Sequence, residues 1–467
     1  MFKEIKFGPV YSNLDDTQHP EGVMAVSMNA YVDEMGDHVK RDGLTFWTAK
    51  DSSKIDGIYE TKSVNAGTVL VATGGYVCKM AADKSFTTLT GAYEERGKQV
   101  VWAEDFNFVF ITAGEQVYKL DLTNNTCNVV SGNSPTKASH IVWVQSYLLT
   151  NGKDSSEAGN PGDIHYSDDV ADAYALSDSW EVFNNESNPD SSIALLSDWE
   201  EIFSIGPYST EARYNDGTTP WGRLEGTYSG WGTLSGDSAK IIGGNLYFLT
   251  SRDSAVKVAK VEERAPTVIS WPYDDLVRGF STHSDAIGWG VVMKGRPFYV
   301  ITWPTEDVTL AYNIEQDNWS QWSFRSGSDD LRWLGNCYCF SRSQGKHFVG
   351  DRRDNGRIYT LSGTQDDSNS IRMQLTSGFI NHGTNLSKFN NYLKIKTNSP
   401  LGYTLEYRDD GTGSFVNSRT VVPASGEFMK KENSWGEYTQ RQWQVTHTAN
   451  EAFVMSSFWE DFEEGTH

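Results

Sequence analysis

Residues capable of phosphate binding or nucleophilic attack occur in this chain, but their spacing does not match the motifs that such chemistry requires. The stretch 91–98 has a glycine near each end and closes on Lys98, as a phosphate-binding loop would. However, five residues separate Gly91 from Gly97, and Gln99 stands where that loop needs Ser or Thr. The sequence also lacks the Gly-x-Ser-x-Gly elbow of hydrolases and the His-Glu-x-x-His helix of zinc proteases. We therefore interpret 91–98 as a turn.

Paired carboxylates are a second chemical possibility, because glycosidases built on propellers use two of them. Such enzymes often carry Ser-x-Asp-x-Gly-x-x-Trp turns, and two segments, 167–170 and 408–411, resemble that turn in part. Neither has the glycine and the tryptophan at the required spacing, and 62 acidic residues make chance pairs common. The sequence predicts a protein that is not an enzyme. A propeller that binds or cleaves glycans is the alternative.

Potential metal ligands are scattered. The nine histidines are dispersed along the chain, so only the fold could gather them. Cys337 and Cys339 are two residues apart, which would place both on one face of a strand. Because they lack a Cys-x-x-C partner pair, we interpret all four cysteines as plain thiols, not as zinc ligands or a disulfide framework. The sequence thus predicts no catalytic, cofactor-binding or metal-binding residues.

A repeated hairpin organises the chain. Val69–Met80 aligns without a gap with Val109–Leu120, forty positions later, and each copy reads as an apolar strand, a turn with glycine and a second strand. A hairpin that recurs every 40 to 50 residues or so is typical of propeller blades. We therefore predict an all-β protein whose main part is a β-propeller of six or seven blades. Five looser copies of the hairpin follow, at 147–167, 199–214, 245–259, 298–312 and 347–361.

The repeats divide the chain into three regions. Beyond the last hairpin, clean alternation of polar and apolar residues predicts a small antiparallel domain. Two extended pieces near the N-terminus, Ser27–Tyr31 and Lys40–Thr45, are expected to enter the first blade, and 458–464 is expected as an acidic aromatic tail. The predicted regions are an extended N-terminal arm (1–50), a propeller (51–365) with loop insertions (151–163 and 215–238), and a C-terminal β-sandwich-like domain (371–467).

The charge balance limits the partners. Lys and Arg number 40 against 62 Asp and Glu, so the formal net charge is −22 at pH 7. Such a surface repels phosphate, which argues against tight nucleic-acid binding. No stretch reaches the roughly 20 apolar residues that span a bilayer, and Met1–Phe7 lacks the apolar core of a signal peptide. We expect a soluble protein that is not secreted by that route and does not insert into a membrane.

Two segments are not explained by packed blades. The insertion 215–238 carries Trp221 and Trp231 among many glycines, which would let it stand away from the core. A tryptophan in a propeller more often wedges between blades, and we favour that role for most of the 16 tryptophans, but both interpretations stay open for this loop. The C-terminal segment adds Phe458 and Trp459. These four aromatic residues are our hypothesis for a contact with a neighbouring protein.

Several short motifs stand out: Ser27–Tyr31 with Arg41–Leu44, Ser197–Tyr214, Leu310–Ile314 with Asp317–Trp322, and Val349–Asp351 with Gly356–Leu361. Together they resemble the packaged-DNA stabilisation or tail hub proteins of short-tailed bacteriophages. The most specific is the Trp199 hairpin, which in the family pairs a Trp-x-acidic-x-Ile/Phe strand with a Ser-Thr-x-Glu-x-Tyr/Phe strand. Here Glu211 directly follows Thr210, a departure of one residue from that pattern. The resemblance covers residues 27–361.

The resemblance implies a structural protein of the virion tail without catalytic residues or cofactors. It implies a homo-oligomeric ring, a hexameric hub or nozzle below the portal and adaptor, that continues the DNA channel, retains packaged DNA and allows its ejection. The implied partners are the portal and adaptor proteins above, and tail fibre, spike or needle proteins at the periphery or tip. Double-stranded DNA would pass through without sequence-specific binding, which suits an acidic lumen. Such a protein is made in the bacterial host cytoplasm and ends in the virion.

Overall fold

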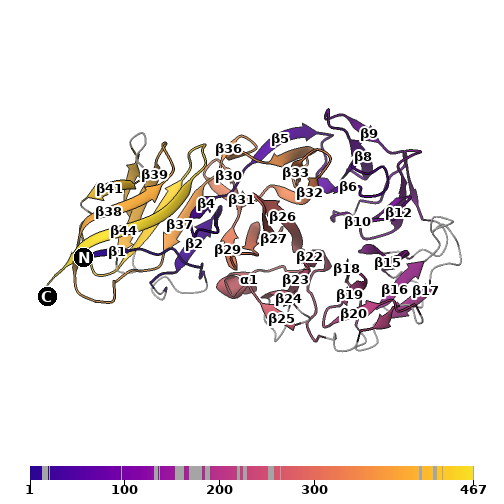
Figure 1. Ribbon diagram of the computed structural model, residues 1–467, viewed down its shortest axis with the longest axis horizontal. Coiled ribbons are helices and arrows are strands. Elements are labelled where there is room, and N and C mark those ends of the chain that lie inside the picture. The colour runs from indigo at the N-terminus through magenta and orange to yellow at the C-terminus, as the bar shows by residue number, and fades with distance from the viewer. Residues whose placement is uncertain are drawn as a thin grey trace.

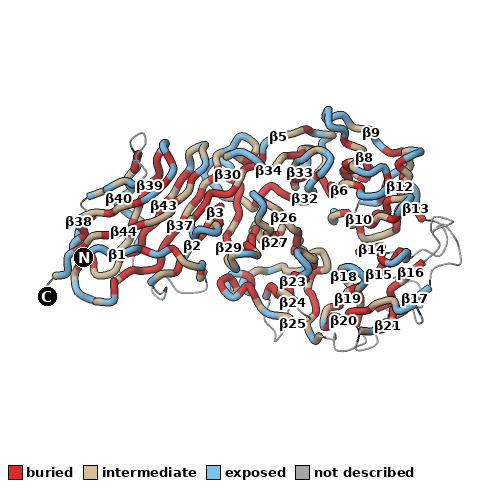
Figure 2. The backbone as a smooth tube through the Cα atoms, viewed as in Figure 1, coloured by how far each residue is buried: buried red, intermediate tan, exposed pale blue. Residues whose placement is uncertain are grey.

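Short apolar strands joined by tight turns make up most of the computed structural model, and they form a ring of small sheets with a β-sandwich beside it (Figure 1). Buried segments run along the strands of both parts (Figure 2). The structure describes residues 1–12, 19, 21–95, 97–130, 135, 137–152, 162–167, 181–184, 190–217, 221–224, 229–250, 257–262, 265–409, 413–423, 429–433 and 435–465.

Five blades of the ring are antiparallel sheets of four consecutive strands. In sequence order they consist of β6 (Ile55–Glu60), β7 (Val69–Thr73), β8 (Tyr76–Met80) and β9 (Phe86–Thr88); β10 (Val101–Glu104), β11 (Val109–Thr112), β12 (Val117–Asp121) and β13 (Thr126–Val129); β14 (Ile141–Val144), β15 (Tyr147–Asn151), β16 (Asp163–Ser167) and β17 (Glu181–Asn184); β18 (Ala194–Asp198), β19 (Glu201–Ile205), β20 (Thr210–Tyr214) and β21 (Gly222–Arg223); and β22 (Lys240–Ile242), β23 (Asn245–Thr250), β24 (Lys257–Glu262) and β25 (Ala265–Val268).

The hairpins that repeat forty residues apart are the two middle strands of the first two blades, β7–β8 and β11–β12. The first turns at Gly74 and Gly75, whose φ angles are 54° and 78°, and the second includes Gly114 at 98°. Glycine adopts this left-handed conformation without the steric cost that a side chain would add. The repeat therefore marks the blades, as predicted.

Two further blades belong to larger sheets. One consists of β26 (Ile287–Met293), β27 (Arg296–Trp303), β28 (Val308–Asn313) and β29 (Asn318–Gln321), and the other contains β32 (Gly335–Ser341), β33 (Lys346–Asp351) and β34 (Arg357–Leu361). The fourth strand of this last blade is β5 (Leu44–Ala49), which comes from near the N-terminus and pairs antiparallel with β34. The described strands thus form a propeller of seven blades, and β5 closes the ring without a covalent link.

The first strands of the blades surround the axis of the ring. In the order β10, β14, β18, β22, β26, β32 and β6, each first strand lies next to the first strand of the following blade. Apolar side chains fill the space between blades. Trp102 of β10, for example, packs so closely on Gly57 of β6 that a Cβ there would come within 2.8 Å of the indole nitrogen, and it stacks on Tyr59 at 5.5 Å between centroids. This tryptophan is a wedge between blades, the role favoured from the sequence.

The sandwich draws its strands from both ends of the chain. One sheet contains β1 (Phe2–Glu4), β3 (Ala30–Val32), β4 (His38–Lys40), β38 (Lys388–Thr397), β41 (Met429–Asn433), β42 (Glu437–Tyr438) and β44 (Val454–Glu464). The other contains β2 (Met24–Met28), β37 (Met373–Ser377), β39 (Tyr403–Asp409), β40 (Val416–Val421) and β43 (Arg441–His447). This second sheet continues into the propeller, because β2 also bridges to β29.

Two expectations about the chain ends are corrected. The N-terminal region is not a separate arm that enters the first blade, since β1 pairs with β44, β2 pairs with β37, and β5 completes the last blade. The segment 458–464 is not a tail, because it belongs to β44, which lies between β4 and β38. Burial alternates along this strand, so that Phe458, Glu460 and Phe462 are buried while Glu463 is exposed.

Helices are short and connect strands. Those in the described part of the chain are α1 (Asp274–Arg278) and the 3-10 turns η1 (Gly236–Ser238) and η3 (Trp271–Tyr273). Two small hairpins, β30 (Ser323–Ser326) with β31 (Asp329–Arg332) and β35 (Gln365–Asp366) with β36 (Asn369–Ser370), complete the described elements. None of these helices has the length and apolar character needed to cross a bilayer.

Candidate functional site

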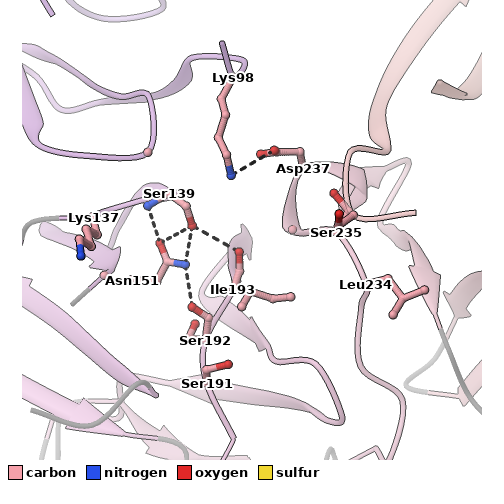
Figure 3. A pocket seen from close by; sticks show the side chains of 14 residues that line it. Lys98, Lys137, Ser139, Asn151, Ser191, Ser192, Ile193, Leu234, Ser235 and Asp237 are labelled. Atoms are coloured by element: carbon pink, nitrogen blue, oxygen red, sulfur yellow. Dashed lines mark hydrogen bonds and ion pairs between the residues drawn. The ribbon is translucent and has the colours of Figure 1, made fainter. Parts of the chain in front are cut away.

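The loops that lead into the first strands of several blades surround a pocket of about 590 Å³ on one face of the propeller (Figure 3). Its lining is mainly small and polar, with five described serines and an asparagine supplied by different blades. The described lining residues are Lys98, Gly114, Lys137, Ser139, Asn151, Gly152, Ser191, Ser192, Ile193, Leu234, Ser235, Gly236, Asp237 and Ser284.

Asn151, at the end of β15, organises one side of this pocket. Its side chain is 1% exposed, and its Oδ1 accepts hydrogen bonds from the backbone amides of His140 (2.7 Å) and Ser139 (3.2 Å). Its Nδ2 donates to the carbonyl oxygen of Ser192 at 2.9 Å. Since His140 precedes β14 and Ser192 precedes β18, one buried amide ties the entrances of two blades together. Such a satisfied buried amide fixes the loops and serves the shape of the opening.

An ion pair spans the pocket. Lys98 Nζ lies 3.5 Å from Asp237 Oδ2, and the two residues precede β10 and β22, the first strands of blades that are not neighbours (Figure 3). The Lys98 side chain is 49% exposed, so solvent screens the attraction and the pair contributes little stability, about 0 to 1 kcal/mol. Asp237 is the one carboxylate in the described lining, which also contains no aromatic residue. The described pocket thus has neither the carboxylate pair of a glycosidase nor the aromatic surface that stacks on sugars.

His140, on the wall behind Asn151, is uncharged at neutral pH. Burial lowers its pKa from the ordinary 6.5 to about 4, because the protein interior disfavours the imidazolium. Its Nδ1 lies 3.1 Å from the hydroxyl oxygen of Ser139. The imidazole is therefore a neutral part of the wall.

Trp221 does not stand away from the core, contrary to the loop prediction. It is 1% exposed and packs edge-on against Tyr147, with 5.8 Å between ring centroids. Its carbonyl oxygen accepts a hydrogen bond from Arg213 Nη1 at 3.0 Å, and the next residue begins β21, the outer strand of its blade. Gly232 of the same insertion serves close packing, since a Cβ there would come within 2.2 Å of the backbone of Pro207, whereas Gly217 and Gly230 have open space around them. Residues 218–220 and 225–228 of this insertion lie outside the described residues.

The other predicted interface residues differ in exposure. Trp231 is partly buried against the cluster between the fourth and fifth blades. Phe458 is 1% exposed and lies in the sandwich core, so the hypothesis that it contacts another protein is corrected. Its neighbour Trp459 points to the outer face of the sheet and stacks on Phe2. The structure therefore leaves Trp459, and in part Trp231, accessible for a contact.

The remaining chemical candidates are structural. The described residues 91–95 and 97–98 lie in the loop between β9 and β10, and Gly91 approaches β13 so closely that a Cβ would come within 2.0 Å of the Cys127 carbonyl oxygen. All four cysteines are free thiols, and burial raises the pKa of Cys337 and Cys339. No cluster of three or more potential metal ligands is found among the described residues. Residues 153–161 of the first insertion lie outside the described residues, as do 168–170 and 410–411 of the two partial turns.

Sequence reasoning missed a buried polar junction between the sandwich and the propeller. Arg41 is 1% exposed, forms an ion pair with Asp366 at 2.5 Å, and donates to the Asn29 Oδ1 at 2.8 Å. Asn29 has a φ of 53°, and its Oδ1 also accepts a hydrogen bond from the backbone N–H of Ser323 at 2.9 Å. Asn29 and Arg41 belong to the motifs 27–31 and 41–44 noted above, so the signal was present, but only the fold shows that it concerns domain attachment.

The fold and the pocket define a class of protein, a β-propeller with a polar opening on one face and a β-sandwich attached to its last blades. The model of a protein family described as "Bacteriophage P22 Gp10, beta-propeller" matches residues 17–366. This match covers most of the chain, so the protein belongs to that family of phage DNA-stabilisation proteins. It is a structural phage protein, which confirms the family and the propeller fold that the sequence motifs indicated.

Solved structures match the chain at low identity. The extracellular domain of a hybrid two-component system from B. thetaiotaomicron is 7% identical, with a TM-score of 0.46 over 75% of this chain and 42% of that one. The N-terminal domain of Nup159 is 9% identical, with a TM-score of 0.42 over 72% and 98%. The computationally designed Ika8 protein is 10% identical, with a TM-score of 0.37 over 68% and 99%. The chain thus spans less than half the length of the first of these, and no curated protein matches it.

Proposed function

We propose that the protein assembles as a homo-oligomeric ring, a hexamer, in the phage tail below the portal and adaptor. There it continues the DNA channel, helps to retain the packaged genome and allows its ejection. The observation that carries this proposal is the family match over residues 17–366, because it identifies a phage DNA-stabilisation protein. Tail fibre, spike or needle proteins are the partners proposed at the periphery or tip.

The architecture supports a structural role. The strand β5 closes the propeller without a covalent link, and the buried Arg41–Asp366 ion pair lies where the sandwich joins it. A load on one part is therefore transmitted to the other. The net charge of −22 disfavours adhesion to DNA phosphates, as a channel component requires. An assembly of this kind needs rigid protomers more than a catalytic centre.

Deletion of the protein from the phage tests the proposal. Particles that lack it should package DNA and then lose it on storage or mild heating, and the purified protein added to freshly filled heads should restore DNA retention. A nuclease-protection assay measures the retained DNA. Particles that keep their DNA and infect normally without the protein would refute a role in genome retention.

The polar pocket on the face of the propeller does not favour the alternative, a propeller that binds or cleaves glycans. Its described lining has the single carboxylate Asp237, which is already paired with Lys98, and no aromatic residue. Saturable binding of host surface polysaccharide to the purified protein, lost on an Asp237→Asn substitution, would restore this alternative.

A further inference from the structure

The turn between β18 and β19, which we call the acidic tip (Asp198–Glu201), exposes a tryptophan at a conformational cost. Trp199 is 92% exposed, and its φ is 52°, a left-handed conformation that bulky residues rarely adopt. Residues held in this way cost of the order of 1 to 3 kcal/mol. Within the protomer that cost is not offset by burial of the indole. An exposed aromatic residue in a strained turn is a feature expected of a contact with another molecule.

Carboxylates surround this tryptophan. Asp198 and Glu201 are directly opposite one another across the β18–β19 pair, and Glu200 between them is exposed. The exposed indole of Trp199 thus stands among acidic side chains, so the acidic tip is suited to a positively charged surface.

The sandwich carries such a surface on the outer face of its first sheet. Lys394 of β38 is directly opposite Lys431 of β41, and Lys396 follows two residues later on the same face. This is again a pair of like charges across two strands, here positive. Three lysines therefore gather on one face of a protein whose net charge is −22. An anionic partner would relieve their repulsion.

Aromatic rings adjoin these lysines. Phe2 of β1 stacks on Trp459 of β44, with 5.1 Å between centroids and 11° between ring planes. The Nζ atoms of Lys394 and Lys431 lie 5.6 and 3.9 Å from the centroid of the Tyr392 ring. We call this surface the lysine–aromatic patch. Its rings offer flat apolar area for an indole, and its ammonium groups offer partners for carboxylates.

We infer that the acidic tip of one protomer docks on the lysine–aromatic patch of a second copy of this chain. The tip supplies a tryptophan and carboxylates, and the patch supplies aromatic rings and lysines, so the two surfaces are complementary in both respects. They lie on different parts of the molecule, the tip on the propeller and the patch on the sandwich (Figure 1). A contact between two different surfaces repeats head to tail and closes into a ring when its rotation permits.

The overall negative charge does not prevent this contact. At physiological ionic strength charges are screened beyond roughly 8 Å, so the local complementarity at the contact outweighs the distant repulsion. Three carboxylates also lie on this outer face. Glu4 is directly opposite Trp459, Asp461 lies between Phe2 and Tyr392 and is 3.4 Å from the amino terminus of Met1, and Glu463 follows on β44. The lysines lie on the neighbouring strands β38 and β41, where Lys394 and Lys431 face one another. The inference rests on the ring proposed above.

Charge exchange tests the contact. We would compare the sedimentation of the wild-type protein with a Lys394→Glu/Lys431→Glu variant, an Asp198→Lys/Glu200→Lys variant, and a protein that carries all four changes. Each double variant should associate about tenfold or more weakly, and the fourfold variant should recover association, because the charges are reversed on both sides. Association of the wild type should weaken as salt is raised.

Trp199→Gly separates the contact from the fold. Glycine suits the φ of 52°, so the melting temperature should stay the same or rise, whereas association should weaken about 30-fold if the indole is an anchor worth about 2 kcal/mol. Lys62→Glu/Lys84→Glu, two exposed lysines of the propeller outside both surfaces, is the matched charge control and should associate normally.

The outcomes are distinguishable. A wild-type protein that never associates, alone or on assembling tails, would overturn the ring and this inference with it. A ring that forms normally in both double variants would overturn the inference and leave the ring. Loss of association in the double variants without recovery in the fourfold variant would show that tip and patch do not face one another, and would also overturn it.

Discussion

Buried histidines make the folded protein sensitive to acid. His140 is 1% exposed, and burial lowers its pKa to about 4. Burial has the same effect on His38 and His447, whose pKa values are also lowered to about 4. The unfolded chain binds a proton on each imidazole near pH 6.5. Between these values the unfolded state holds more protons than the folded state, so stability is complete above pH 6.5 and is lost as the pH falls towards 4.

The first prediction concerns His140→Asn. The wild-type protein should lose about 3 kcal/mol of unfolding free energy through His140 alone between pH 7 and pH 4. Whatever the starting stability of the variant, its loss over the same pH range should be smaller by about that amount, because asparagine does not titrate. Denaturant titrations at both pH values measure the difference. An equal loss in both proteins would show that His140 is protonated in the fold.

A second prediction follows from the burial of Trp221. Trp221→Ala should reduce the free energy of unfolding by about 3 to 5 kcal/mol, because it leaves a cavity between the third and fourth blades. Trp231→Ala, at a half-buried position, should cost less. Thermal melts of the two variants compare them directly. Equal and small shifts would favour the original prediction of a loop that stands away from the core.

Strands from the two ends of the chain hold its parts together. β44 lies between β4 and β38, and β5 supplies the outer strand of the seventh blade. Because these strands come from opposite ends of the sequence, neither the propeller nor the sandwich can be completed until most of the chain is present. We therefore expect folding to depend on contacts that are distant in sequence, which are slow to form.

A third prediction compares two adjacent residues of β44. Phe458→Ala should cost about 3 to 5 kcal/mol, since the ring is buried in the sandwich core. Trp459→Ala should change stability far less, by roughly 1 kcal/mol or less, because it faces outward. Denaturant unfolding of both variants is the measurement. Similar costs would mean that 458–464 does not form the strand.

Net charge sets how the protein as a unit meets DNA. With 62 acidic and 40 basic residues, long-range electrostatics oppose contact with the phosphate backbone. The lysine–aromatic patch is small and adjoins the carboxylates Glu4 and Asp461, so it does not reverse this balance. In the channel proposed above, such a surface would let DNA slide past.

The fourth prediction is that the isolated protein does not bind duplex DNA measurably at physiological salt, with affinity weaker than the 10⁻⁴ to 10⁻⁶ M or so of ordinary non-specific binding. Fluorescence anisotropy of a labelled duplex tests this, and a basic DNA-binding protein serves as the positive control. Binding that weakens steeply with added salt would indicate a basic surface that contacts phosphate and would contradict the proposed passive channel.

The sequence alone determined the features that depend on neighbouring residues. Alternating apolar residues and turn glycines, as at Gly74 and Gly114, predicted the hairpins, because local geometry dictates which residues a strand or a tight turn accepts. The repeat of that unit predicted the propeller, and the motifs at 27–31 and 197–214 indicated the family. The lack of catalytic spacing was likewise visible.

The tertiary structure decided what depends on long-range pairing. Alternation along 454–464 fits both a surface segment and a central strand, and only the pairing of β44 with β38 and β4 shows that Phe458 is buried. Composition made the loop around Trp221 look detached, but the indole is buried and Gly232 permits close packing. The polar pocket, the Arg41–Asp366 junction and the opposed lysines of the sandwich all join residues far apart in sequence. Burial and cross-strand neighbours are properties of the assembled sheets, which is why no local pattern specified them.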